Sequence, residues 1–218
     1  MSLHRRGLVV LLAAASVLAS CDASRAGTAV RASTSPLACA TAVGETLTDV
    51  RIWLGIAADG SQDATVRVVN LTPATANSTF LLSTGKDLVC GSKYSDQVDY
   101  SKVTTSDEDS LRAGDVLLGG GGNDSLQYVL GGYFRAGADN DAVGALNGGT
   151  FDGGAGNDSV NDGMPDGIYL GGDGDDLLFS MSGGAFDGGV GTDGSYLYIA
   201  GVLKNVEQCT LLDDSACP

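Results

Sequence analysis

A nine-residue pattern of three glycines and one aspartate most constrains what this chain can fold into. The copies read GGGGNDSLQ at 119–127, GGAGNDSVN at 153–161, GGDGDDLLF at 171–179 and GGVGTDGSY at 188–196, and a degenerate copy, AGADNDAVG, begins at residue 136. Successive copies start 17 or 18 residues apart, so each unit contains the nonapeptide and a shorter second half. A short fixed period punctuated by glycine is typical of a solenoid.

Apolar residues keep the same register in each unit, which a disordered glycine-rich linker would not maintain. They form three sets: Leu126, Val143, Val160 and Leu178; Phe134, Phe151, Tyr169 and Phe186; and Val129, Leu146, Met164 and Met181. In stacked turns each set would become a continuous row facing the interior, and five turns at a strand spacing of ~4.8 Å would span roughly 24 Å. The sequence therefore predicts an all-β fold, a parallel β-roll or β-solenoid of about five double-repeat turns.

The nonapeptide resembles GGxGxDxUx, in which U is a large apolar residue, the calcium-binding repeat of the RTX or hemolysin-type family. The resemblance covers residues 119–196 and implies a β-roll with up to four ions held between neighbouring loops. It assigns metal binding to Asp124, Asp141, Asp158, Asp176, Asp193, Gly120, Gly122, Gly154, Gly156, Gly172, Gly174, Gly189 and Gly191. Ala136 and Asp139 replace two of the glycines, which weakens the sites beside Asp141. Ser195 replaces the apolar residue of the last copy, which suits a fraying or capping turn.

The loops also favour a hard divalent cation on physical grounds. Glycine allows φ > 0 and close backbone approach, so a loop can turn its carbonyl groups inward. The aspartates would stack along one edge, where like charges repel, and residues 113–203 hold 13 acidic residues against one basic residue, Arg135. Carboxylate and carbonyl oxygens suit calcium, whereas magnesium demands a tighter octahedron. The alternative is that the aspartates only form turns, as Asn-Asp and Asp-Gly often do.

The solenoid is expected to occupy residues 113–203, between a β-rich N-terminal region with an entry cap at 39–112 and a C-terminal cap at 204–218. Alternating apolar residues at 50–56 and 64–69 predict two half-buried strands in the N-terminal region. Weaker copies of the repeat keep Asp96 and Val98 in residues 91–100, and Asp109 and Leu111 in residues 106–118. These segments are either worn turns or solvated acidic loops.

Residues 1–20 have a basic start and an apolar run, as a secretory signal peptide does. The following Leu18-Ala19-Ser20-Cys21 resembles a bacterial lipobox, which implies cleavage before Cys21 and lipid attached to this cysteine. Residues 21–38 are small, polar and without period, which suits a tether between the lipid and the domain. We therefore expect an exported bacterial lipoprotein, anchored in a membrane at the cell envelope or the cell surface.

The other cysteines are Cys39, Cys90, Cys209 and Cys217. An even number in an exported chain predicts two disulfides. Three pairings are possible, of which Cys39–Cys90 with Cys209–Cys217 is the most local. A zinc site is the alternative, although the close CxxC pairing of such sites is missing.

Charge and composition exclude several classes of function. The net charge of −15 argues against nucleic acid as a partner. The single histidine, His4, lies in the expected signal peptide, which leaves the mature chain without a Ser-His-Asp triad, a Cys-His pair or a histidine-ligated metal. Adjacent acids such as Asp175 and Asp176 usually point apart, so they are no sign of a catalytic pair.

These observations favour a non-enzymatic, calcium-stabilised surface or periplasmic lipoprotein with a structural or adhesive role. Calcium would be its cofactor, and calcium ions and a membrane lipid anchor would be its partners. The alternative is a β-solenoid that acts on polysaccharides or binds carbohydrate. The N-terminal strands could also bind a surface glycan or a protein, and no residue in them identifies which.

Overall fold

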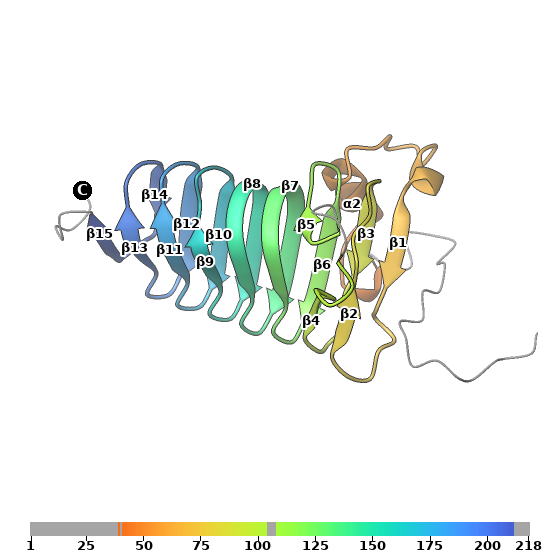
Figure 1. The fold of residues 1–218 in the computed structure, drawn as a ribbon, viewed down its shortest axis with the longest axis horizontal. Coiled ribbons are helices and arrows are strands. Elements are labelled where there is room, and N and C mark those ends of the chain that lie inside the picture. The colour runs from red at the N-terminus through yellow and green to blue at the C-terminus, as the bar shows by residue number, and fades with distance from the viewer. Residues whose placement is uncertain (1–38, 40, 104–107, 212–218) are drawn as a thin grey trace, which may run out of the picture.

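The computed structural model describes residue 39, residues 41–103 and residues 108–211. These residues form a parallel β-solenoid of about eight turns, so the predicted all-β class and the solenoid are confirmed. Figure 1 shows the strands side by side along one axis, with the N-terminal region in orange and yellow at one end and the last strands in blue at the other. The solenoid is longer than the five turns that the nonapeptides indicated.

Each turn contributes a strand to each of two parallel faces. The first face contains β1 (Arg67–Asn70), β3 (Asp87–Cys90), β6 (Val116–Gly121), β10 (Ile168–Asp173), β12 (Ala185–Val190) and β14 (Val202–Lys204). The second contains β2 (Ser78–Phe80), β4 (Asp96–Val98), β5 (Ser110–Leu111), β9 (Ser159–Gly163), β11 (Leu177–Met181), β13 (Gly194–Tyr198) and β15 (Gln208–Leu211). The long strands β7 (Ser125–Ala138) and β8 (Ala142–Ala155) run from the second face into the first and pair on both.

The three predicted apolar rows lie inside the solenoid. Their strands are in register through Leu126, Val143, Val160 and Leu178, through Phe134, Phe151, Tyr169 and Phe186, and through the pairs Val129–Leu146 and Met164–Met181. All twelve side chains are at most 1% exposed. The four aromatic rings stack with centroids 5.2, 5.0 and 4.6 Å apart, and each such contact contributes about 0.5–1.5 kcal/mol beyond burial.

The additional turns come from segments that have lost most of the repeat glycines. β1 with β2, and β3 with β4, form the first two turns, and Val69, Val89 and Leu117 extend the row of Phe134. The worn copy at residues 91–100 is therefore a turn of the solenoid rather than a solvated loop.

The solenoid also continues past the last nonapeptide, where β14 and β15 add one more turn. Ser195 is in register with Leu178 and with Cys209, and its side chain is buried. The expectation that Ser195 marks a fraying or capping turn is therefore wrong, because a further turn pairs with its strand.

Residues 47–53 form a helix, so the strand predicted at 50–56 is wrong. α2 (Leu47–Trp53) begins after Thr46, whose Oγ1 accepts a hydrogen bond from the backbone N–H of Asp49 at 3.1 Å. Val50 and Leu54 are buried, while Ile52 between them is 65% exposed. The alternating pattern contained an i, i+4 pair that suits a helix equally well. A 3₁₀-helix, Asp63–Thr65, occupies the start of the second predicted strand, which forms only from Arg67 as β1.

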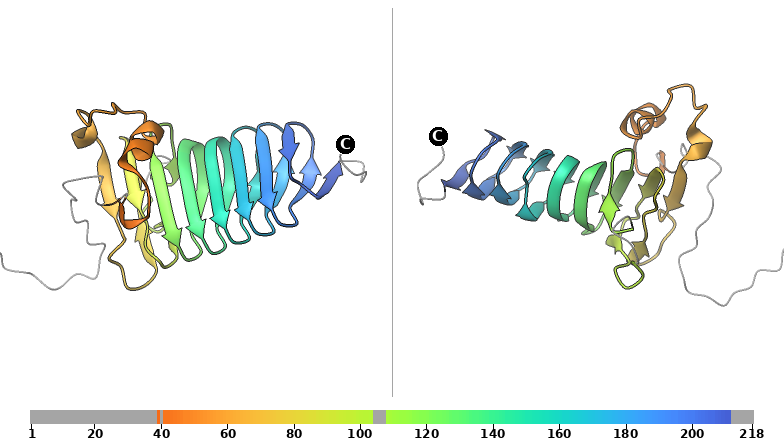
Figure 2. Two further views of the ribbon diagram at one scale, coloured as in Figure 1. Left: turned by 180° about the vertical axis from the view of Figure 1, so that it is seen from behind. Right: turned by 45° about the horizontal axis from the view of Figure 1, so that its top comes forward.

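α2 lies against the outer side of the first face near its N-terminal end, as the view from behind in Figure 2 shows. Val50 and Leu54 belong to a buried cluster with Val116 and Leu118. The ring of Trp53 stacks on Tyr133 with 4.3 Å between centroids. This helix covers the part of the first face that would otherwise expose the apolar side chains of β3 and β6.

A disulfide joins Cys39 to Cys90 of β3 and ties this segment to the solenoid, as predicted. Cys217 of the second predicted pair lies outside the described residues, as do Cys21, the signal peptide and the tether, so these remain predictions. In the described part of the chain, every helix is too short or too polar to span a bilayer.

Candidate metal centre

One corner of the solenoid carries an acidic side chain in each turn from the second to the eighth. This carboxylate row consists of Asp96, Asp124, Asp141, Asp158, Asp176, Asp193 and Glu207. The backbone N–H of each aspartate donates to a carboxylate oxygen of the next turn over 2.6–2.9 Å. One oxygen of each carboxylate from Asp124 to Glu207 therefore links two turns, and an oxygen of Asp96 accepts instead from the backbone N–H of Ser92 in its own loop.

The other oxygen of each aspartate is buried without a hydrogen-bond partner among the described residues. These atoms are Oδ1 of Asp96 and Oδ2 of Asp124, Asp141, Asp158, Asp176 and Asp193. A buried polar atom without a partner costs about 1–3 kcal/mol, and more if it is charged. A cation beside these oxygens would remove that cost.

The first glycine of each loop leaves the space in which these oxygens lie. A methyl group added at Gly153 would come within 3.0 Å of Asp158 Oδ2 and of the carbonyl oxygen of Gly171 in the next turn. A methyl group at Gly171 would meet Asp176 Oδ2 and the carbonyl oxygen of Gly188 in the same way. A carboxylate oxygen of one turn and a carbonyl oxygen of the next therefore converge in the loops of Asp124, Asp158, Asp176 and Asp193, and calcium takes this set of donors.

The electrostatics of the carboxylate row disfavour its charged form. Burial raises the pKa of Asp124 to about 9, of Asp141 to about 8, of Asp158 to about 6 and of Asp176 to about 7. The charges of nearby carboxylates raise these pKa values further, while the backbone N–H donors lower them. Without a cation, part of the row would hold protons near neutral pH.

Seven of the eight glycines predicted to bind metal have a positive φ that shapes the loops, and Gly191 is the exception. The second glycines, Gly120, Gly137, Gly154, Gly172 and Gly189, have φ values from 99° to 117°, which favour glycine strongly. The third position has φ values of 134° at Gly156 and 141° at Gly174, and Asp139 adopts 77° there. The first glycines adjoin the free carboxylate oxygens and lie outside the predicted set of metal-binding residues: Gly119, Gly153, Gly171 and Gly188.

Aspartates at the opposite corner are fully hydrogen-bonded and offer a contrast. Asp115 accepts hydrogen bonds from the backbone N–H groups of Asp87 and Arg112, each at 2.9 Å. Asp87 accepts from the N–H of Ser83 at 2.6 Å and pairs with Arg67. Burial alone therefore does not leave a carboxylate oxygen without a partner in this fold.

The carboxylate row has one acidic side chain in each turn, so its members do not form a compact cluster. Within the described part of the chain, no group of three or more His, Cys, Asp or Glu side chains is arranged to hold a metal. An ion in the row would depend on carbonyl oxygens and water for most of its ligands. The structure brings the five predicted aspartates together and adds Asp96 and Glu207, whereas Asp109 of the worn copy at 106–118 is not part of the row.

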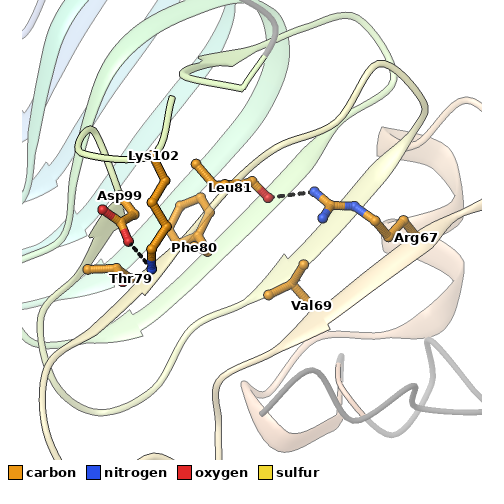
Figure 3. Close-up of a pocket in the computed structure, with 7 residues that line it drawn as sticks. All are labelled: Arg67, Val69, Thr79, Phe80, Leu81, Asp99 and Lys102. Carbon is orange, nitrogen blue, oxygen red and sulfur yellow. Dashed lines mark hydrogen bonds and ion pairs between the residues drawn. The ribbon is translucent and has the colours of Figure 1, made fainter. Parts of the chain in front are cut away.

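Apart from the carboxylate row, a hollow of about 180 Å³ lies at the first turn of the solenoid (Figure 3). Its lining residues are Arg67, Val69, Thr79, Phe80, Leu81, Asp99 and Lys102. Both cationic side chains are engaged, because Arg67 donates to the carbonyl oxygen of Leu81 at 2.5 Å and Lys102 pairs with Asp99 at 2.6 Å. The hollow is small and lends no support to a glycan or protein ligand.

The candidate centre thus rests on the residues and their geometry. Comparisons with models of protein families, with curated proteins and with solved structures found no match to this chain. The likeness to the RTX repeat remains a resemblance of residues and spacing over 119–196.

Proposed function

We propose that this protein binds calcium along the carboxylate row and depends on the bound ions for the stability of its solenoid. The observation that carries the proposal is the series of buried carboxylate oxygens without hydrogen-bond partners among the described residues, of which those of Asp124, Asp158, Asp176 and Asp193 lie near a carbonyl oxygen of the next turn. Calcium accepts about six to eight oxygen ligands in a flexible geometry, which suits carboxylates, carbonyls and water at a loop corner. The free energy of metal binding then contributes directly to folding.

The sites of the row are not equivalent. Ala136 is buried where the other loops have their first glycine, so it adds a methyl group at the place where one on Gly153 or Gly171 would meet a carboxylate oxygen. Asp139 replaces the third glycine of the same loop. Calcium should therefore bind more weakly on both sides of Asp141 than between Asp158 and Asp176 or between Asp176 and Asp193.

We place this calcium-binding solenoid on an exported lipoprotein with a non-enzymatic, structural or adhesive role. The lipobox-like stretch before Cys21 supports the anchor, and the Cys39–Cys90 disulfide suits an oxidising compartment. Because calcium is far more plentiful outside the cytoplasm, the ions would complete folding after export.

Calcium added to chelator-treated protein, as residues 22–218, is expected to raise its melting temperature and to release heat, whereas magnesium does so weakly. Each occupied site adds about 2.7 kcal/mol of stability when calcium is at about 100 times its Kd. The double variant Asp158→Asn/Asp176→Asn keeps the oxygens that accept backbone N–H groups and removes two charges. It should lose most of the calcium-dependent gain in calorimetric titrations and in circular dichroism melts.

Asp175→Asn is the matched control for this double variant. Asp175 is an exposed neighbour of Asp176 whose Oδ1 accepts from the backbone N–H of Thr192, and earlier turns have Asn140 and Asn157 in this place with the same type of bond. This variant should keep the full calcium response. A wild-type protein that is equally stable in calcium and in chelator, with no heat of binding, would show that the row only links turns.

Carbohydrate binding is the second candidate, and one observation favours it. Phe179 and Tyr196 lie on the outer side of the second face, 50% and 59% exposed, with ring centroids 6.2 Å apart. Exposed apolar side chains that lie together mark interaction surfaces. Binding to a glycan array that is lost in Phe179→Ala would support this candidate, and an array without signal for the wild type would dismiss it.

A further inference from the structure

Tyr169 differs from its neighbours in the aromatic row by one buried hydroxyl group. Its ring stacks between Phe151 and Phe186 with centroids 5.0 and 4.6 Å away, and the residue is fully buried. The hydroxyl has no hydrogen-bond partner among the described residues. Phenylalanine would fill the same place without a buried polar atom, so the hydroxyl calls for an explanation.

Ser195 presents the same situation in the neighbouring row. It follows Leu126, Val143, Val160 and Leu178, and its backbone is in register with Leu178. Its side chain is 1% exposed, and Oγ lacks a hydrogen-bond partner within the described part of the chain. Two consecutive turns thus carry a hydroxyl where the preceding turns are apolar.

Both hydroxyls belong to side chains that are buried in the interior, as the free carboxylate oxygens are. Tyr169 and Gly171 are two residues apart on β10 and so face the same interior, and Asp176 Oδ2 lies in the space beside Gly171. Ser195 lies two residues after Asp193 and is buried with it. Burial raises the pKa of Tyr169, and the charges of Asp176, Asp158 and Asp193 add to this shift.

We propose that the hydroxyl groups of Tyr169 and Ser195 belong to the calcium site between Asp176 and Asp193 and make it the tightest site of the row. The inference rests on the proposed calcium function and adds two side chains that the nonapeptide pattern does not contain. A buried ion needs oxygen ligands for itself and partners for its bound water. Four polar atoms that have no hydrogen-bond partner among the described residues lie in these two turns: Tyr169 Oη, Asp176 Oδ2, Asp193 Oδ2 and Ser195 Oγ.

The competing explanation is that the two hydroxyls are tolerated defects of an apolar interior. Two substitutions, Tyr169→Phe and Ser195→Val, distinguish these explanations. Each introduces a residue type that other turns have in the same row. If the hydroxyls are defects, both variants are more stable than the wild type by the same amount in calcium and in chelator. If the hydroxyls serve the ion, the gain appears in chelator and shrinks or reverses in calcium.

Calorimetric titration of residues 22–218 with calcium is the direct test. Both variants should bind calcium about tenfold more weakly at the tightest site, within the range of about 10- to 100-fold found when partners of metal ligands are removed.

Terbium(III), used as a probe ion for calcium, gives a second reading because a nearby tyrosine sensitises its luminescence. Tyr169→Phe should lose most of the emission excited through tyrosine and keep the emission excited at terbium itself.

Tyr128→Phe is the matched control, since it makes the same chemical change on an exposed tyrosine of the second face. It should leave calcium affinity and sensitised emission at wild-type values. Wild-type affinity in both Tyr169→Phe and Ser195→Val would overturn the inference while the calcium function stands. A wild type that binds neither calcium nor terbium would overturn the inference together with the function.

Discussion

Replacing Gly172 by alanine is expected to destabilise the solenoid by roughly 2–6 kcal/mol, although it alters no charge. The backbone at Gly172 has a φ of 114°, and a residue with a side chain held in such a region costs about 1–3 kcal/mol. The new methyl group would also lie within 3.0 Å of the carbonyl oxygen of Gly154, and forcing extra atoms into a packed site costs about 1–3 kcal/mol more. Thermal unfolding should show a melting temperature lower by on the order of 10 °C.

Gly163→Ala is the matched control in the neighbouring half-turn. A methyl group at Gly163 would have its nearest contact, the carbonyl oxygen of Ser180, at 3.6 Å, and the backbone there is not left-handed. This variant should be neutral or slightly stabilising, because alanine restricts the unfolded chain. Equal melting temperatures for Gly172→Ala and Gly163→Ala would mean that the turns can separate, and that the stacked glycine backbone does not fix their spacing.

The apolar rows of the solenoid could be predicted from the nearly constant length of the repeat along the chain. Residues 17 or 18 positions apart must meet in neighbouring turns, so Phe134 and Phe151 were placed together before any packing was known. The first two turns lack this regular spacing, and their place in the stack depends on which apolar residues fit the end of the core. The helix at 47–53 was missed for a different reason, because Val50 and Leu54 satisfy both a strand and a helix pattern.

The candidate site was predicted in part for the same reason. Asp158 and Asp176 hold equivalent places in the repeat, and the structure joins them through one N–H to carboxylate bond of 2.8 Å. The role of Gly171 was missed, because only the stacked turns show that its missing side chain makes room for a carboxylate oxygen. The sequence placed Tyr169 in the aromatic row, but a pattern of apolar residues does not reveal that its hydroxyl group has no hydrogen-bond partner in the described part of the chain.

In the presence of a chelator, the free energy of unfolding is expected to fall as the pH rises from about 4 to about 9. The aspartates have an ordinary pKa of 3.8, and burial raises it to values between about 6 and about 9 at Asp158, Asp176, Asp141 and Asp124. The folded state then binds more protons than the unfolded state over this range, so stability decreases with pH. A single pKa unit at each of the four groups amounts to about 5 kcal/mol, comparable with the whole stability of many domains.

Calcium should reverse this slope, because an ion binds the ionised carboxylates and competes with protons for them. Melting temperatures measured from pH 5 to pH 9, in chelator and in calcium, should therefore diverge as the pH rises; these limits span roughly the range in which the row titrates. Asp158→Asn/Asp176→Asn should flatten the chelator profile because asparagine does not ionise, whereas Asp175→Asn should leave it steep. A wild-type profile in chelator that stays level or rises would mean that the row ionises without cost, and the strongest physical reason for an ion at this corner would then be gone.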